Sequence, residues 1–427
     1  MLAPTPPIGW NSWDSYGLTI TETEFKANVD WFHQHLQPYG WQYVVVDEGW
    51  YLAHPENAGK QGADQGYTLS PDGRYLPATN RFPSAAGEQG LKPLADYAHS
   101  LGLKFGIHII RGIPKEAVEK NLPITDSPYH AADAADQSDT CRWNPDNYGL
   151  KDNAAGQAYY NSLGRLYAGW GVDFLKVDCI SQPYKAGEIH MMSTALKNSG
   201  RPIVLSLSPG PTPVDEAADL RQYAQLWRIS DDMWDVWAKK PGEGAFPQSL
   251  FDQFDVLSRW APHVTSGHWP DADMLPIGYL GPRPGYGKAR ESRFTPDEIR
   301  TLLTLWCIAR SPLILGANLL RIDPSLETIL TNREVLAVDQ RSSQNHPVVE
   351  TPGTVVWTAH LDTGGRAVAV FNRGDTSATI TYPWTDLGIS PHSHQVRDLW
   401  QQKDLGQQKE LKVTLAPHAA SLFRVRE

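Results

Sequence analysis

The most constraining feature of this sequence is a repeated alternation of short apolar stretches with longer stretches of helical periodicity, from residue 7 to about residue 318. Eight apolar stretches take part: "PIGWNSW", "WQYVVVDEGW", "LKFGIHII", "DFLKVDC", "PIVLSLS", "QLWRISDD", "VTSGHW" and "SPLILGAN". Strands that alternate with helices pair in parallel, because each parallel pair needs a long crossover connection. Eight such units close into a (β/α)8 barrel. We therefore predict an α/β fold with a TIM barrel over residues 1–338.

Two of the segments between the strands carry clear helix signals. In "ITETEFKANVDWFHQHL", apolar side chains recur at three- and four-residue spacing behind a threonine. They are Phe25, Val29, Phe32 and Leu36. The segment "TPDEIRTLLTLWCIAR" begins with a threonine, a proline and two acids, which is typical of a helix start. Both segments are predicted to be helices of the barrel.

The pattern changes after residue 338, where helical periodicity ends. Short strand-like segments such as "GTVVWTAHL", "GRAVAVFNRG" and "KELKVTLAPHAASLFRV" follow, separated by Gly, Asp, Asn and Pro. This pattern is typical of antiparallel sheets. We predict a C-terminal antiparallel β-sandwich domain over residues 339–427 that packs on the barrel and carries no catalytic group. The longest stretch without a clear element, 112–153, is predicted to be a functional loop or a lid.

Charge and composition exclude several kinds of partner. The formal net charge is −10, which disfavours nucleic acids and anionic membrane surfaces. No apolar run approaches the roughly 18 residues that a membrane span needs. The start "MLAPTPPIGW" lacks the basic and apolar segments of a secretion signal. The expected location is cytoplasmic, or periplasmic or secreted with the signal removed. The sequence leaves open whether the protein forms an oligomer.

The cysteines and histidines give no metal signature. The three cysteines, Cys141, Cys179 and Cys307, have no CxxC spacing, so neither a zinc knuckle nor a disulfide framework is encoded. No histidine pair falls at ligand spacing near the acidic residues, although "DAD" at 271–273 could cap a helix or bind a metal. We predict neither a metal nor a cofactor.

Charged and polar residues gather where the predicted strands end, and barrel enzymes place their chemistry at the carboxyl ends of their strands. They are Asp47 and Glu48 after the second strand, His108 late in the third, Lys176 and Asp178 at the fourth, Arg228 and Asp232 at the sixth, and Asp271 and Asp273 after the seventh. Several uncompensated acids at one end of a barrel would cost stability without a functional reason. We therefore predict the active site there.

Two of these acids suit the cleavage of a glycoside. Side chains alternate along a strand, so Lys176 and Asp178 project to the same side, as do Arg228 and Asp232. The ammonium of Lys176 is expected to keep Asp178 ionised as a nucleophile. Crowding by acids and partial burial are expected to raise the pKa of Asp232, which would then protonate the leaving oxygen. Such a pair is the minimum equipment of a retaining glycosidase, although a buried Lys and Asp can also be a structural pair.

At these residues the sequence resembles glycoside hydrolase family 27, the α-galactosidase and α-N-acetylgalactosaminidase family. The matching stretches are "PPIGWNSWDSYG", "YVVVDEGW", "LKFGIH", "WGVDFLKVD", "LWRISDD", "WPDADML", "SPLILGANL" and "NREVLAVDQ". Each stretch is weak alone, but eight in order cover nearly the whole chain. The resemblance implies a metal-independent exo-acting enzyme that retains anomeric configuration.

The resemblance also implies a role for each matching residue. Asp178 would attack the anomeric carbon, and Asp232 would act as acid and then as base. Trp13 would pack on the sugar, and Asp47 and its neighbour would bind the hydroxyls at carbons four and six. The remaining ring hydroxyls would be held by Lys176, Arg228 and Asp273. In secreted relatives a bridge similar to Cys141–Cys179 occurs, which makes this pair a candidate disulfide.

Three positions depart from the usual α-galactosidase pattern. Glu48 follows Asp47 where two aspartates are usual, and this change resembles β-L-arabinopyranosidases, whose sugar matches galactose but lacks carbon six. His108 stands where a tyrosine is common. Ser208 stands where α-galactosidases tend to carry a glutamate that contacts the hydroxyl on carbon two. A serine leaves more room in the pocket, as in the N-acetylgalactosaminidases. We rank α-D-galactoside first, β-L-arabinopyranoside second and α-N-acetylgalactosaminide third. A sugar-binding protein without catalysis is the rival from another class.

Overall fold

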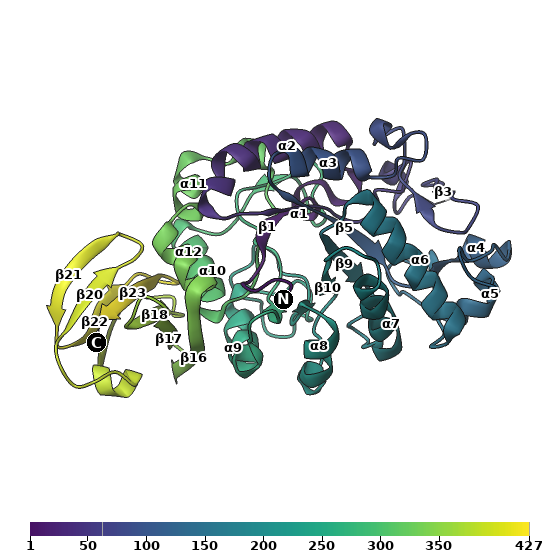
Figure 1. The fold of residues 1–427 in the computed structure, drawn as a ribbon. Helices are drawn as coiled ribbons and strands as arrows, with labels where there is room; N and C mark the ends of the chain where they lie inside the picture. The colour runs from purple at the N-terminus through teal and green to yellow at the C-terminus, as the bar shows by residue number, and fades with distance from the viewer. Residues whose placement is uncertain (62, 427) are drawn as a thin grey trace.

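The computed structural model describes residues 1–61 and 63–426 (Figure 1). Eight parallel strands form a curled sheet in the order β12-β11-β10-β9-β5-β2-β1-β15. In chain order they are β1 (Ile8–Asn11), β2 (Tyr43–Val46), β5 (Lys104–Ile110), β9 (Phe174–Asp178), β10 (Val204–Leu207), β11 (Leu226–Arg228), β12 (Trp269–Asp271) and β15 (Leu313–Leu315). The sheet closes where the backbone N–H of Leu275, just after β12, donates to Ile314 of β15 at 2.8 Å. The predicted barrel is confirmed.

Helices surround this sheet (Figure 1). The longer ones are α2 (Glu22–His35), α3 (Lys92–Ser100), α6 (Ala154–Trp170), α7 (Ala186–Lys197), α8 (Ala217–Tyr223), α9 (Leu250–Trp260), α10 (Pro296–Ala309), α11 (Pro324–Leu330) and α12 (Arg333–Arg341). Both helices predicted from caps are present, and Thr21 and Thr295 each form a capping box with the glutamate three residues later. Phe25 of α2 is fully buried against the ring of Trp10 on β1. Burial of an aromatic side chain of this kind contributes about 1.5 to 3 kcal/mol to folding.

One strand differs from its predicted position. The stretch "VTSGHW" ends where the seventh strand begins, since β12 runs from Trp269 to Asp271. Val264 and Trp269 pack in a small apolar cluster at the amino ends of the barrel strands, which also contains Leu226. This packing explains the apolar residues of the stretch. Asp271 is consequently the last residue of the strand rather than a residue after it.

The second sheet begins with β16 and lies beside the barrel (Figure 1). Its six strands run in the order β16-β17-β18-β23-β20-β21, and a two-stranded sheet of β19 and β22 completes the sandwich. The strands are β16 (Ser342–Glu350), β17 (Thr354–Leu361), β18 (Arg366–Asn372), β19 (Ala378–Pro383), β20 (His394–Asp398), β21 (Lys403–Gln408), β22 (Glu410–Leu415) and β23 (Ala420–Arg426). Helix α10 joins the two parts, because Thr301 donates to the carbonyl of His418 and Thr304 accepts from Trp400.

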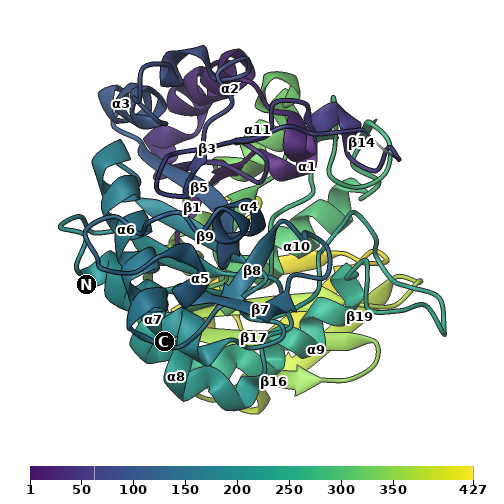
Figure 2. The ribbon, with the colours of Figure 1, turned by 90° about the vertical axis from the view of Figure 1, so that its right-hand side faces the viewer.

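The long segment after β5 contains elements that its sequence did not reveal. Its strands β6 (Ile113–Pro114), β8 (Asn147–Leu150) and β7 (Ala135–Thr140) form a small antiparallel sheet, with α4 (Lys115–Glu119) and α5 (Ala131–Ala134) beside it. Figure 2 shows β7 and β8 on the side of the molecule that faces the viewer. A disulfide between Cys141 and Cys179 ties this segment to the end of β9, so the candidate pair is present.

Short elements complete the structure outside these layers. They are α1 (Trp13–Tyr16), β3 (Thr68–Leu69), β4 (Tyr75–Leu76), β13 (Tyr279–Leu280) and β14 (Arg290–Glu291). Among the described residues, no helix has both the length and the apolar character that crossing a membrane requires.

Candidate active site

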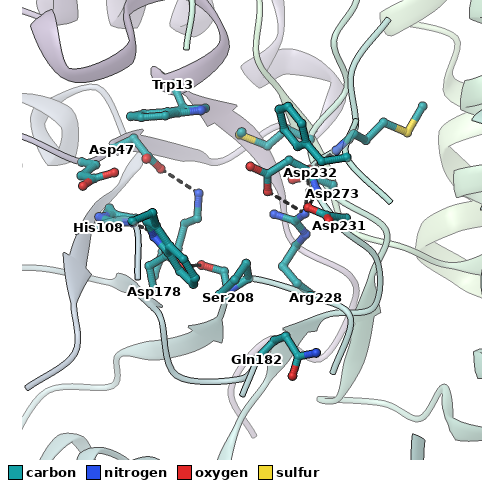
Figure 3. A pocket seen from close by; sticks show the side chains of 18 of the residues that line it. Trp13, Asp47, His108, Asp178, Gln182, Ser208, Arg228, Asp231, Asp232 and Asp273 are labelled. Atoms are coloured by element: carbon teal, nitrogen blue, oxygen red, sulfur yellow. Dashed lines mark hydrogen bonds and ion pairs between the residues drawn. The ribbon is translucent and has the colours of Figure 1, made fainter. Parts of the chain in front are cut away.

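A cavity of about 760 Å³ opens at the carboxyl ends of the barrel strands. All ten predicted site residues line it. They are Trp13, Asp47, Glu48, His108, Lys176, Asp178, Ser208, Arg228, Asp232 and Asp273. In Figure 3 the carboxyl groups of Asp178 and Asp232 lie on different sides of this cavity. The strands therefore bring together what the sequence placed far apart.

Asp178, the last residue of β9, is held by four contacts. Its Oδ1 accepts from the backbone N–H of Cys179 at 2.7 Å and from the hydroxyl of Ser208 at 3.0 Å. Its Oδ2 lies 3.3 Å from the indole nitrogen of Trp143 and 3.4 Å from Nε2 of His108. Hydrogen bonds to a carboxylate favour its charged form. Burial opposes this effect, but His108, Lys176 and the Cys179 N–H together hold the pKa of Asp178 below its ordinary value.

The direct partner of Asp178 is His108 rather than Lys176, which corrects the sequence-based expectation. The ammonium of Lys176 forms its ion pair with Asp47, at 2.9 Å, and only its longer-range charge acts on Asp178. Burial alone would lower the pKa of His108, yet the nearby carboxylates of Asp47 and Asp178 raise it. The imidazole thus tends toward its charged form and can donate a hydrogen bond to Asp178.

The neighbourhood of Asp232 also differs from expectation. Its side chain is 45% exposed, and its Oδ1 lies 3.1 Å from Nη2 of Arg228. The same guanidinium lies 2.9 Å from Oδ2 of Asp273, whose side chain is only 5% exposed. Burial raises the pKa of Asp273, and the neighbouring Asp232 and Asp271 raise it further against the effect of Arg228. Burial and crowding by acids, predicted for Asp232, therefore describe Asp273.

Alternation along the sixth strand holds for only part of the predicted set. Strand β11 ends at Arg228, and the chain bends at Ser230 and Asp231. Ser230 is buried and accepts a hydrogen bond from Gln253, while Asp231 lines the cavity together with Asp232. The carboxylate of Asp231 accepts the backbone N–H of Asp232 at 2.8 Å, which helps to fix the position of the acid.

Glu48 reaches into the cavity from the end of β2. Its Oε1 accepts a hydrogen bond from the side-chain amide of Asn144 at 2.8 Å, and Asn144 belongs to the long segment after β5. Burial raises the pKa of Glu48, and the charge of Asp178 adds to this effect while His108 opposes it. The longer side chain is thus fixed in place rather than swung out into solvent.

Glu48, His108 and Asp178 each offer one atom that could bind a metal ion, and these atoms lie within 4.8 Å of one another. Spacing along the chain did not predict this cluster, because its members come from three different strands. The contact between His108 and Asp178 and the electrostatic interaction of His108 with Glu48 link the three groups.

Two close approaches shape the wall of the cavity. A Cβ on Gly285 would lie 2.4 Å from the indole nitrogen of Trp13, so a larger residue there would displace the tryptophan. A Cβ on Gly210 would lie 2.1 Å from the carbonyl oxygen of Ser230. The wall beside Ser208 can therefore form only with glycine at position 210.

Several residues of the cavity were not predicted. Asp14 lies at its base, fully buried, and burial raises its pKa. Arg142, Trp143 and Phe246 come from loops whose sequences show no catalytic pattern. The signal that could have found Trp143 is its position two residues after Cys141, because the bridge to Cys179 places it beside Asp178.

Comparison with known proteins gives a consistent result. A family model described as alpha galactosidase A matches residues 147–341, and one described as the alpha galactosidase C-terminal beta sandwich domain matches residues 351–425. Alpha-galactosidase 2 of Arabidopsis thaliana is 30% identical, over 99% of this chain and 89% of the relative.

Two solved structures are more similar. A family 27 β-L-arabinopyranosidase from Geobacillus stearothermophilus is 44% identical, with a TM-score of 0.92 over 100% of this chain and 97% of that chain. A protein from Bacillus halodurans proposed to be an α-N-acetylgalactosaminidase is 39% identical, with a TM-score of 0.86 over 99% of this chain and 97% of that chain.

Proposed function

Because the chain belongs to glycoside hydrolase family 27, we propose that this glycosidase acts with retention and releases one terminal sugar of galactose configuration, with β-L-arabinopyranoside as the preferred substrate. The observation that carries the mechanism is the placement of Asp178 and Asp232 on one cavity, the first held by four contacts and the second open to solvent. Two carboxyls that face one sugar are the equipment of retaining hydrolysis.

In the first step, a carboxylate oxygen of Asp178 attacks the anomeric carbon. The bond from that carbon to the leaving oxygen breaks, and Asp232 gives its proton to this oxygen. The products are a covalent glycosyl ester on Asp178 and a free alcohol. In the second step, Asp232 takes a proton from water, the water oxygen attacks the anomeric carbon, and the ester bond breaks to regenerate the Asp178 carboxylate.

The two carboxyl environments support this division of roles. The depressed pKa of Asp178 keeps it anionic before attack. Asp232 is exposed on the side from which a leaving group or water must come, and a bound substrate would cover it. Arg228 bridges Asp232 and Asp273 and would hold the acid in place while protons move.

The choice of sugar depends on Glu48. The resemblance assigns Asp47 and its neighbour to the hydroxyls at carbons four and six, and Glu48 is one methylene longer than the usual aspartate. Since Asn144 fixes the Glu48 carboxyl in the cavity, that space is filled. A sugar without carbon six then fits better than galactose, in agreement with the specificity of the 44% identical relative.

This conclusion reorders the ranking made from sequence, in which α-D-galactoside came first. α-D-Galactoside becomes the second candidate, supported by curated α-galactosidases that are 24 to 30% identical, although a 28% identical relative from Gallus gallus is an α-N-acetylgalactosaminidase. α-N-Acetylgalactosaminide remains third, supported by the small side chain of Ser208 and the adjacent Gly210 on the cavity wall.

A panel of three nitrophenyl glycosides tests the proposal. We expect kcat/KM to be highest for the β-L-arabinopyranoside, lower for the α-D-galactoside and lowest for the α-N-acetylgalactosaminide. Asp178→Ala should abolish turnover of all three, with Asp386→Ala, at an exposed aspartate of the second domain, as the matched control. The assignment is wrong if Asp178→Ala retains activity within tenfold. Binding of these sugars without nitrophenol release would indicate a non-catalytic sugar-binding protein.

A further inference from the structure

We propose that the mouth of the cavity contains a binding site for the leaving group, formed by Trp143 and Phe246, and that this site takes a flat six-membered ring. The inference rests on the proposed function, because a leaving group exists only if the protein cleaves a glycoside. It goes further by assigning the chemistry of the part of the substrate that departs.

The first observation is the placement of exposed apolar side chains. Among the described residues, the strongly exposed large apolar side chains are Met1, Trp143, Phe246, Leu320 and Leu405. Trp143 and Phe246 are the aromatic members of this set, and both line the catalytic cavity. Cavities that bind small molecules are lined mainly by apolar and aromatic side chains.

Trp143 is fixed on the nucleophile side of the cavity. It follows Cys141, whose disulfide with Cys179 anchors the loop directly beside Asp178. Its indole nitrogen lies 3.3 Å from Oδ2 of Asp178, and yet the side chain remains 47% exposed. The polar edge of the ring is therefore held by the nucleophile while much of the apolar surface stays available.

Phe246 is fixed on the acid side. Two residues later, the backbone N–H of Gln248 donates to the carbonyl of Asp232 at 2.7 Å, so this loop runs beside the proton donor. The ring of Phe246 packs edge-on against Tyr286, with centroids 5.2 Å apart, and Tyr286 packs against Trp234 at 5.2 Å. Phe246 is nevertheless 46% exposed, so this support orients the ring without covering it.

The chemistry of the ligand follows from these two rings. The charged and polar residues at the strand ends serve one sugar, and the leaving group must sit outside them, where Asp232 can reach its oxygen. An aromatic side chain there binds the flat C–H face of a second sugar or the π-face of an aryl group. Both ligands share one feature, a planar apolar face, and the experiment separates them.

The test compares leaving groups of different size on one glycosyl unit, the one that wild type prefers. A glycosyl fluoride has no ring to contact Phe246, whereas a nitrophenyl glycoside and a disaccharide each have one. Phe246→Ala should lower kcat/KM about 2- to 12-fold for a ring-bearing substrate, and change it less than twofold for the fluoride. Phe246→Leu, which keeps the bulk but loses the ring, should show the same selective loss. This second variant keeps the test valid if the alanine variant does not fold.

Leu405→Ala, an exposed apolar residue on β21 of the second sheet, is the matched control and should change none of the three substrates. A loss confined to the nitrophenyl glycoside identifies an aryl site, and a loss that includes the disaccharide identifies a sugar site. If both Phe246 variants lower all three substrates equally, or none, the leaving-group site is refuted. If wild type cleaves none of the three, the proposed function itself is wrong.

Discussion

Shortening Glu48 by one methylene should change which sugar the enzyme prefers. Glu48→Asp removes the group that fills the space assigned to the hydroxymethyl of galactose, and it also breaks the 2.8 Å hydrogen bond from Asn144. One methylene in a substrate pocket is worth about 1 to 3 kcal/mol of discrimination. The ratio of kcat/KM for α-D-galactoside to that for β-L-arabinopyranoside should therefore rise about 10- to 200-fold.

A control separates lost bulk from lost anchoring. Asn144→Ala releases Glu48 but keeps its full length, and the lost hydrogen bond costs about 1 to 3 kcal/mol of stability. We expect the ratio to rise less in Asn144→Ala than in Glu48→Asp, because the released side chain keeps its full length and still occupies the space for part of the time. The assay measures initial rates on the two nitrophenyl glycosides for wild type and both variants. An unchanged ratio in Glu48→Asp would refute the argument that this side chain fills the pocket.

Two further predictions concern the surroundings of Asp178. Burial raises the pKa of Asp178, and His108 is the main group that lowers it. His108→Gln should therefore raise this pKa and shift the acidic limb of the pH profile of kcat/KM to higher pH. If the limb does not move, Lys176 alone keeps the nucleophile ionised. The Cys141–Cys179 bridge closes a loop with a sequence separation of 38 residues. Replacing both cysteines with serine should therefore lower the free energy of unfolding, measured by urea titration, by about 4 kcal/mol. A loss below about 1 kcal/mol would contradict the loop-closure account.

The parts that follow a local period or a local sequence signal were predictable. The strands and the helices α2 and α10 follow from apolar spacing and caps, and eight of the ten site residues follow from the rule that parallel strands end at one edge. Trp13 and Ser208 were assigned only through the family resemblance. Lys176 and Asp178 share a face because β9 is regular through both residues.

The misplaced details depend on contacts between distant segments. The sequence paired Lys176 with Asp178 because they are two residues apart, whereas the structure brings Asp47 closer to the ammonium. Asp232 was expected to be partly buried, whereas its side chain is 45% exposed. The sequence could not show this, because Asp232 lies beyond the end of β11 and its exposure depends on the loops around it. Trp143 was missed since its position depends on a disulfide across 38 residues.

The most direct test of the mechanism is to trap the covalent intermediate. A 2-deoxy-2-fluoro glycosyl inactivator of the preferred sugar should form a stable ester, and mass spectrometry of the digested protein should locate it on Asp178 alone. The ester should be absent in Asp178→Ala and present in the control Asp386→Ala. A label on any other residue, or an active enzyme that is never labelled and releases a product of inverted configuration, would contradict the account.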